Sequence, residues 1–278
     1  MPSAVDVASS YRLLRAPAVA AIAGRDFRIT RSYRLAFALD VFYGGLDLAF
    51  YFFVAKLVGP VSGASLAGAP TYFGFAAVGL AIGAVLSATM YALSAEVRQE
   101  QLTGTLEVLA AQPVRSVELG VGLLGFPLAF SMLRSGVYLA VASHWMHIDV
   151  TRTSWAGVAV VFAATAVAMA PISFAAGAAV LVFKRGTVVV TAATSVMTLL
   201  GGAVFPIAVL PGWLQWLGRL MPIRFAYDGV RAAIFSGSGW GLDALALLAF
   251  GAVGAPLGMF LFGRALAHAK RVGSLSEY

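Results

Sequence analysis

The chain has 278 residues, of which 60% are hydrophobic and only 11% charged, against roughly 25% charged residues in soluble globular proteins. That charge content cannot cover the surface of a soluble fold of this size, so the composition predicts an all-α integral membrane protein. There is no cysteine, which excludes disulfides and thiolate sites, and the net charge of +7 suits the basic cytoplasmic loops of membrane proteins.

The N-terminal segment, residues 1–34, is basic and amphipathic. Its arginines recur at three- and six-residue steps among Ala, Val, Ile and Leu, at Arg12, Arg15, Arg25, Arg28, Arg31 and Arg34. This pattern predicts a helix in the headgroup plane on the cytoplasmic side, with its basic side on anionic lipid. A basic tail without structure is the alternative interpretation.

Six apolar segments are each long enough to cross the hydrocarbon core, which takes about 20 helical residues. They run over Leu35–Leu57, Thr71–Leu93, Leu119–Ala142, Trp155–Phe183, Thr187–Leu210 and Ala244–Gly263. We therefore expect a six-helix transmembrane domain over 35–265 and a tail over 266–278. With cytoplasmic termini, thirteen Lys and Arg residues lie inside and five outside, with Arg134 inside a span. This asymmetry predicts that both termini, and so the tail, are cytoplasmic.

A polar stretch, QEQLTGTLEVLAAQP at residues 99–113, separates the second and third predicted spans. Leu102, Leu106 and Leu109 recur at helical spacing, and Pro113 disfavours helix at the residue before it. The pattern predicts a short amphipathic helix over 96–112 at the cytoplasmic membrane edge. The spacing alone fits a solvated loop equally well.

Besides Lys56 near the end of the first span, three charged residues lie within predicted spans, where each costs at least about 2.5–3.5 kcal/mol on insertion scales. Asp40 and Asp47 are seven residues apart on one stripe of the first span, and Arg134 is in the middle of the third. An Asp47–Arg134 pair that ties two spans together is one interpretation. A polar lining of a transport path is the other, and the two are compatible.

A pair of histidines, His144 and His147, precedes Asp149 at the outer end of the third span. Histidines at this spacing can bind a metal, but Trp145 favours a position in the interfacial aromatic belt, and we expect no metal site.

Residues 211–236 contain three arginines, Asp228 and two prolines, too many polar groups for an ordinary span. Trp213 and Trp216 can share one helix face at headgroup depth, and Pro222 divides the segment into two short helices. A second stripe, at spacings i, i+4 and i+7, can satisfy its own charges and face water: Arg224, Asp228 and Arg231. The segment is predicted to be a re-entrant hairpin in the outer leaflet; an external loop is the alternative.

The stretch EQLTGTLEVLAAQP resembles the cytoplasmic motif of type-2 ATP-binding-cassette (ABC) exporter permeases. That family typically shows an acidic–basic cluster, then Gly-Thr-Leu-Glu and a proline six residues on. The matching residues here are Glu100, Gly104, Thr105, Leu106, Glu107 and Pro113, whereas Gln101 and Leu102 replace the usual Arg and second Glu of the cluster. The resemblance implies that this segment is the coupling helix, which docks into a groove on a separate ATPase subunit. We expect the Lys184–Arg185 turn to make a second cytoplasmic contact.

A second stretch, residues 201–237, resembles the family's fifth span and the hairpin after it. The match rests on Phe205, Pro206, Leu210, Pro211, Trp213, Leu214, Pro222 and Arg231. The resemblance implies two short helices re-entering the outer leaflet. The outer gate is then expected to contain Phe205, Pro206, Trp213, Trp216, Arg224, Asp228 and Arg231.

Together these matches imply the membrane subunit of an ABC exporter in the bacterial cytoplasmic (inner) membrane. Two permease chains would pair with two copies of a soluble ATPase and move an amphipathic or hydrophobic substrate outward: a drug, a lipid, a natural product or a glycoconjugate. No lysine here is followed by Ser or Thr, as a phosphate-binding P-loop requires, so ATP and Mg would bind the partner and the chain would carry no catalytic residue or cofactor. The alternative is an ATP-independent carrier or channel that uses Asp40, Asp47 and Arg134.

Overall fold

The computed structural model describes residues 20, 24, 34–59, 66, 68–111, 116–145, 150–183 and 186–272. Within them the secondary structure is helical, and no strand occurs. Five helices are long and apolar enough to cross a membrane: α3 (Arg34–Val58), α4 (Tyr72–Leu102), α6 (Ser116–Trp145), α7 (Trp155–Val182) and α11 (Trp240–Val272). The predicted all-α architecture is confirmed in these residues.

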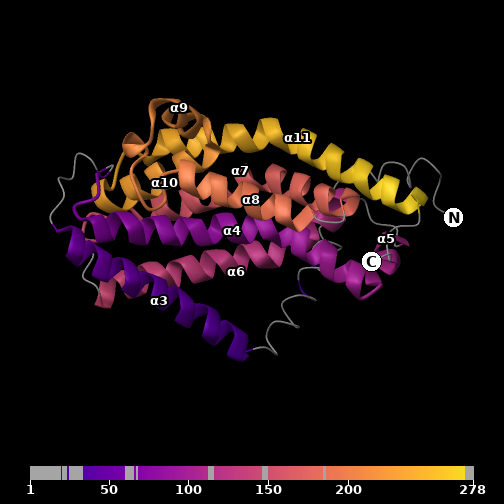
Figure 1. The fold of residues 1–278 in the computed structure, drawn as a ribbon, viewed down its shortest axis with the longest axis horizontal. Helices are drawn as coiled ribbons and strands as arrows, with labels where there is room; N and C mark the ends of the chain where they lie inside the picture. The colour runs from indigo at the N-terminus through magenta and orange to yellow at the C-terminus, as the bar shows by residue number, and fades with distance from the viewer. Residues whose placement is uncertain are drawn as a thin grey trace.

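The long helices lie side by side in an elongated bundle (Figure 1). Its centre is formed by α4 and α7: α4 packs against α6 and α7, and α7 packs against α11. Helix α3 lies at the edge, because only 11% of its apolar window is buried inside the chain, compared with 72% for α4. The apolar side chains of α3 are therefore left for lipid or for another chain.

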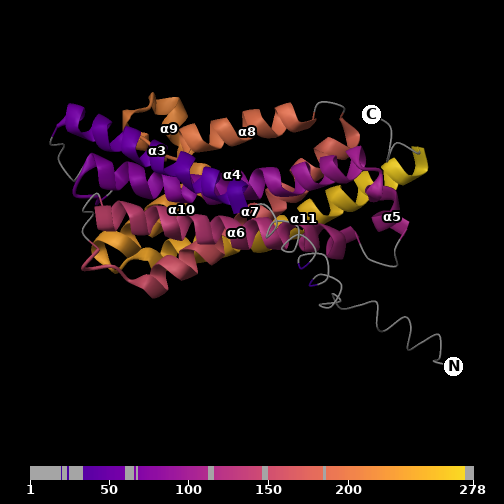
Figure 2. The same ribbon diagram turned by 90° about the horizontal axis from the view of Figure 1, so that it is seen from below.

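The short helices occupy opposite ends of the bundle. Helix α5 (Thr105–Ala111) lies at one end, and α9 (Gly212–Leu220) and α10 (Pro222–Arg231) lie at the other (Figures 1 and 2). A short 3₁₀ turn, η2 (Ile207–Val209), precedes α9, and a π-helical turn, η3 (Ala232–Ser236), connects α10 toward α11. The predicted polar helix and the predicted hairpin are thus separated by the length of the molecule.

The fifth predicted span is shorter than expected. We predicted it to run from Thr187 to Leu210, whereas helix α8 covers Gly186–Leu200, 15 residues. At 1.5 Å per residue it rises about 22 Å, less than the roughly 30 Å of a hydrocarbon core. The helix ends because Gly202 adopts φ +80°, a left-handed conformation open to glycine, and the chain continues in turns. The described chain therefore contains five long apolar helices and this shorter one.

The boundary between the second span and the polar helix also differs from the prediction. Residues 96–102 do not start a separate helix; they continue α4, which ends at Leu102. The break comes at Gly104, whose φ of +70° only glycine adopts easily, and α5 begins at Thr105. The predicted helix over 96–112 is therefore the last turns of α4 followed by a separate helix of 7 residues.

Small residues allow close approach between the helices. A Cβ at Gly251 of α11 would lie 2.6 Å from a methyl of Val167 in α7, and one at Gly258 would lie 2.6 Å from the Pro171 carbonyl oxygen. At the edge of the bundle, Gly44 of α3 faces the ring of Tyr138 in α6, with no space for a Cβ. This packing is typical of membrane helices, which associate through small residues.

Candidate functional site

The turn between α4 and α5 is held by local hydrogen bonds. The Gly104 amide donates to the Gln101 carbonyl oxygen over 3.2 Å, and the Thr103 amide donates to Gln99 over 3.0 Å. The Thr105 hydroxyl donates to the carboxylate of Glu100, a buried residue with 6% of its surface exposed. The acidic residue of the sequence motif therefore fixes the start of α5 and is not on its outer surface.

Helix α5 has one anchored face and one open face. Leu106 is buried in a core cluster that includes Val97 of α4 and Leu119 of α6. Glu107 is exposed, and Val108 beside it has 60% of its surface exposed. Helix α5 is therefore fixed to the bundle on one side and exposes an acidic and an apolar group on the other.

Asp47 and Arg134 line the same pocket. The pocket has a volume of about 320 Å³ and lies between α3, α4, α6 and the end of α8. Arg134 reaches α4, where its Nη2 donates to the Ala84 carbonyl oxygen over 3.3 Å. Asp40 lies on α3, and its side chain is outside the described part of the structure. The arrangement brings the predicted acid and base together from two helices around a shared space.

The segment between α8 and α11 folds into two short helices separated at Met221, with Pro222 in the first turn of α10. On α9, Trp213 and Trp216 have 68% and 63% of their surfaces exposed. The Gln215 amide nitrogen donates to the carbonyl oxygens of Ala208 and Leu210 and so ties α9 to the preceding turn. Helix α9 thus presents aromatic rings away from the bundle.

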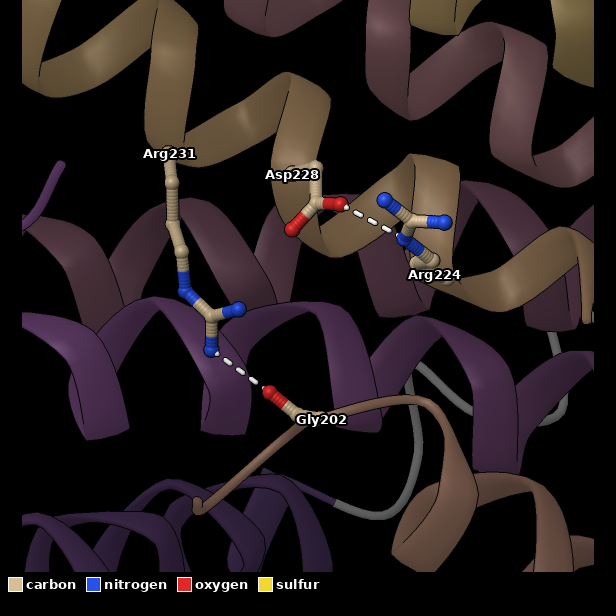
Figure 3. Close-up of polar contacts among 4 residues, drawn as sticks. All are labelled: Gly202, Arg224, Asp228 and Arg231. Atoms are coloured by element: carbon tan, nitrogen blue, oxygen red, sulfur yellow. Dashed lines mark hydrogen bonds and ion pairs between the residues drawn. The ribbon is translucent and has the colours of Figure 1, made fainter. Parts of the chain in front are cut away.

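The charged residues of α10 divide into a pair and a buried cation (Figure 3). Arg224 and Asp228 form an ion pair, with 3.1 Å between Nε and Oδ2. Arg231 was predicted to face water with them, and this is wrong: only 2% of its surface is exposed. The face of α10 that carries Arg231 packs against α4 and the chain after α8, so the side chain is enclosed.

Arg231 connects three segments of backbone. Its Nη2 donates to the carbonyl oxygens of Gly202 at 2.9 Å, Ala203 at 3.1 Å and Phe75 at 3.2 Å. Its guanidinium also lies 3.6 Å from the centre of the Phe75 ring, a cation–π contact. Burial lowers the pKa of Arg231 to about 10, which leaves it charged at neutral pH. The residue links the hairpin to α4 and to the end of α8.

Phe205 and Pro206, the Phe-Pro pair of the second motif, face different spaces. Phe205 lines a pocket of about 400 Å³ beside α4 and α8, and Pro206 lines one of about 280 Å³ beside Arg231. Gly79 is not among the predicted site residues, yet a Cβ there would lie 1.8 Å from the Ala203 carbonyl oxygen that Arg231 binds. Gly79 and Gly83 form a G-x-x-x-G spacing, which is typical of close backbone approach, and the backbone that approaches Gly79 is the bend at Ala203 after α8.

Several predicted residues fall outside the described residues. These are Pro113 after α5, the Lys184–Arg185 turn between α7 and α8, and His147 and Asp149. The same holds for most of the N-terminal segment and for residues 273–278.

The comparisons with known proteins bear on this arrangement of helices. No curated protein matched the chain. Residues 29–235 match the ABC-2 type transporter family, a range that contains α3 to α10, the α4–α5 turn and the hairpin. Because the match covers well over half of the 278 residues, the chain belongs to the ABC-2 type transporter family, whose members are the membrane permeases of ABC transporters.

Proposed function

We propose that this permease exports its substrate with energy from ATP hydrolysed by a separate ABC ATPase, which docks on the α4–α5 turn. The observation that carries the proposal is the geometry of this turn within a chain of this family. Leu106 fixes α5 to the bundle, while Gly104 and Glu107 are exposed, and α5 lies at the end of the bundle opposite the hairpin. No P-loop motif occurs in the 278 residues, and the proposal assigns the nucleotide to a separate ATPase subunit.

The docking surface proposed for the ATPase is the exposed side of residues 102–108. Leu102 and Val108 have 61% and 60% of their surfaces exposed, and Glu107 lies between them. A partner with an apolar groove and a basic rim would bury both apolar groups and pair with the carboxylate. Movement of that partner would then act on α4, which continues without a break from this surface to the far end of the bundle.

The proposed substrate path follows the pocket that contains Asp47 and Arg134. Its other lining residues are mostly small or apolar, among them Gly83, Ala84 and Val204. A pocket with two charged groups among apolar walls suits an amphipathic or hydrophobic substrate. The second pocket, lined by Tyr91, Thr194 and Phe205, extends this polar and apolar character along α8.

We also propose that two copies of the chain work together. Helix α3 exposes Phe42, Phe50 and Phe53, each with more than 60% of its surface accessible. Helix α8 exposes Val188, Val189 and Leu199. Both helices border the Asp47–Arg134 pocket, so a second copy against them would cover exposed apolar surface and close the path from the side.

In the proposed orientation both termini and α5 are cytoplasmic, and the hairpin of α9 and α10 lies in the outer leaflet of a bacterial cytoplasmic membrane. The basic residues of the sequence support it, with thirteen Lys and Arg on the proposed inner side and five on the outer. The hairpin then closes the outer end of the path. Opening requires α9 and α10 to move relative to Gly202 and Ala203, which Arg231 now holds.

The test is purification of the permease with its ABC ATPase in lipid nanodiscs, followed by a screen for compounds that stimulate ATP hydrolysis. Gly104→Trp should abolish stimulation, because the indole would fill the open docking surface and a side chain at φ +70° would strain the turn. Gly59→Trp is the matched control, since Gly59 also has a positive φ and an open Cβ position. Transport that continues without the ATPase would instead indicate a secondary carrier or channel that uses Asp40, Asp47 and Arg134.

A further inference from the structure

A polar pocket of about 280 Å³ lies within the hairpin, between the chain after α8, helix α9 and helix α10. It is separate from the Asp47–Arg134 pocket, and the lining residues of the two do not overlap. Its charged and polar side chains are Gln215, Arg219, Arg224, Asp228 and Arg231. The proposed export mechanism opens the hairpin around this space but assigns no ligand to it.

The pocket carries a positive charge that its own residues do not neutralise. Three guanidinium groups and one carboxylate give it a formal charge of +2. Arg224 and Asp228 neutralise each other. Arg219 donates to the neutral Gln215 side chain over 3.3 Å, and Arg231 donates to backbone carbonyls. Among the described residues, neither Arg219 nor Arg231 forms an ion pair.

Arg231 also has an unused donor. Its Nε is buried and has no hydrogen-bond partner among the described residues, although the side chain lines the pocket. A buried donor attached to a charge costs free energy unless something accepts its hydrogen bond. An anion in the pocket would balance the charge and could accept bonds from the guanidinium groups that surround it.

We propose that this pocket binds a phosphate-bearing anion. Arginine forks match the oxygens of phosphate, and several of them around one space are typical of phosphate recognition. Trp213 and Trp216, exposed on the adjoining helix α9, are residues that prefer headgroup depth in a membrane. The phosphate can therefore come from an anionic phospholipid of the outer leaflet or from solution. The first source rests on the proposed orientation, and the second does not.

Asp228 allows a test in which binding improves. Its carboxylate lowers the positive charge of the pocket, so Asp228→Asn raises the formal charge from +2 to +3 and releases Arg224 from its ion pair. We expect phosphate to bind more tightly to this variant. General damage to the fold would act in the opposite direction.

The experiment uses the full-length permease alone in nanodiscs, so its result does not depend on the ATPase or on transport. Thermal unfolding is measured in phosphatidylcholine, in phosphatidylcholine with increasing phosphatidylglycerol, and in phosphatidylcholine with inorganic phosphate. Arg219→Gln should raise the anion concentration needed for stabilisation at least about tenfold, because a hydrogen bond between charged groups is lost. Arg219 is exposed, so this change should not prevent folding. Arg152→Gln removes an exposed charge that does not line the pocket and should leave the response unchanged.

Stabilisation by phosphatidylglycerol alone supports a lipid headgroup, and stabilisation by inorganic phosphate supports a free anion, provided that Arg219→Gln loses the effect. The proposal is overturned by three results: no response to either anion, an equal loss in Arg219→Gln and Arg152→Gln, or weaker binding in Asp228→Asn.

Discussion

Gly79→Ala should weaken the packing of α4 against the chain after α8, which leads into the hairpin. A Cβ there would lie 1.8 Å from the Ala203 carbonyl oxygen, whereas ordinary contacts are 3.4–4 Å, so the carbonyl must move by more than an ångström. That movement breaks the 3.1 Å hydrogen bond from Arg231. Overpacking destabilises a protein by about 1–3 kcal/mol, and the loss of a hydrogen bond to a charged group by about 1.5–3 kcal/mol. Replacing glycine by alanine within a helix stabilises it by up to about 1 kcal/mol. We expect Gly79→Ala to lower the free energy of unfolding by about 2–4 kcal/mol.

Gly83→Ala, one turn further along α4, is the control for this prediction. Its Cβ would meet only the Tyr227 hydroxyl oxygen at 3.9 Å, so the change should be neutral or slightly stabilising. Chemical denaturation of both variants in the same detergent compares the two free energies directly. Equal stability of Gly79→Ala and Gly83→Ala would show that the chain after α8 does not pack on α4 as described.

Three further predictions concern the membrane path. Asp47→Asn and Arg134→Gln should each lower thermal stability in nanodiscs, and the double variant should recover part of the loss. Strictly additive losses would indicate that both side chains line the path without forming a pair. Replacing both Trp213 and Trp216 by Asp should leave stability in detergent unchanged, because both rings are largely exposed, but should raise dye leak through liposomes. Replacing both by Phe should not raise the leak. An Asp variant that leaks no more than the Phe variant would identify the segment as an external loop. The chain has no cysteine, so Ser238→Cys should react with a membrane-impermeant thiol reagent on intact cells and Thr103→Cys should not. Reaction of Thr103→Cys but not of Ser238→Cys would show that the orientation is the opposite of the one proposed.

The long helices could be predicted from sequence because apolar length alone defines them. The end of α8 was missed because Gly201–Leu210 is as apolar as the helix before it, although Gly201, Gly202 and Pro206 are residues that typically end a helix. The boundary at Gly104 was missed for a related reason. The apolar spacing of Leu102 and Leu106 continues through the break, so periodicity did not reveal it.

The environment of Arg231 depended on tertiary structure. The i, i+4, i+7 spacing correctly placed Arg224 near Asp228, because such pairs meet on any helix. It could not show which segment covers that face at the next turn, where the carbonyls of Gly202 and Ala203 enclose Arg231. Local spacing therefore predicted the ion pair and failed for the buried cation.

In the proposed mechanism, ATP bound to a separate subunit moves the hairpin through α5. The most direct measurement places an environment-sensitive fluorophore at Trp216→Cys, on the exposed face of α9, in nanodiscs that contain the permease and its copurified ABC ATPase. Adding ATP and Mg should change the fluorescence, and the change should disappear with Gly104→Trp but persist with Gly59→Trp. An unchanged response in Gly104→Trp, or no response to ATP in any variant, would contradict the account.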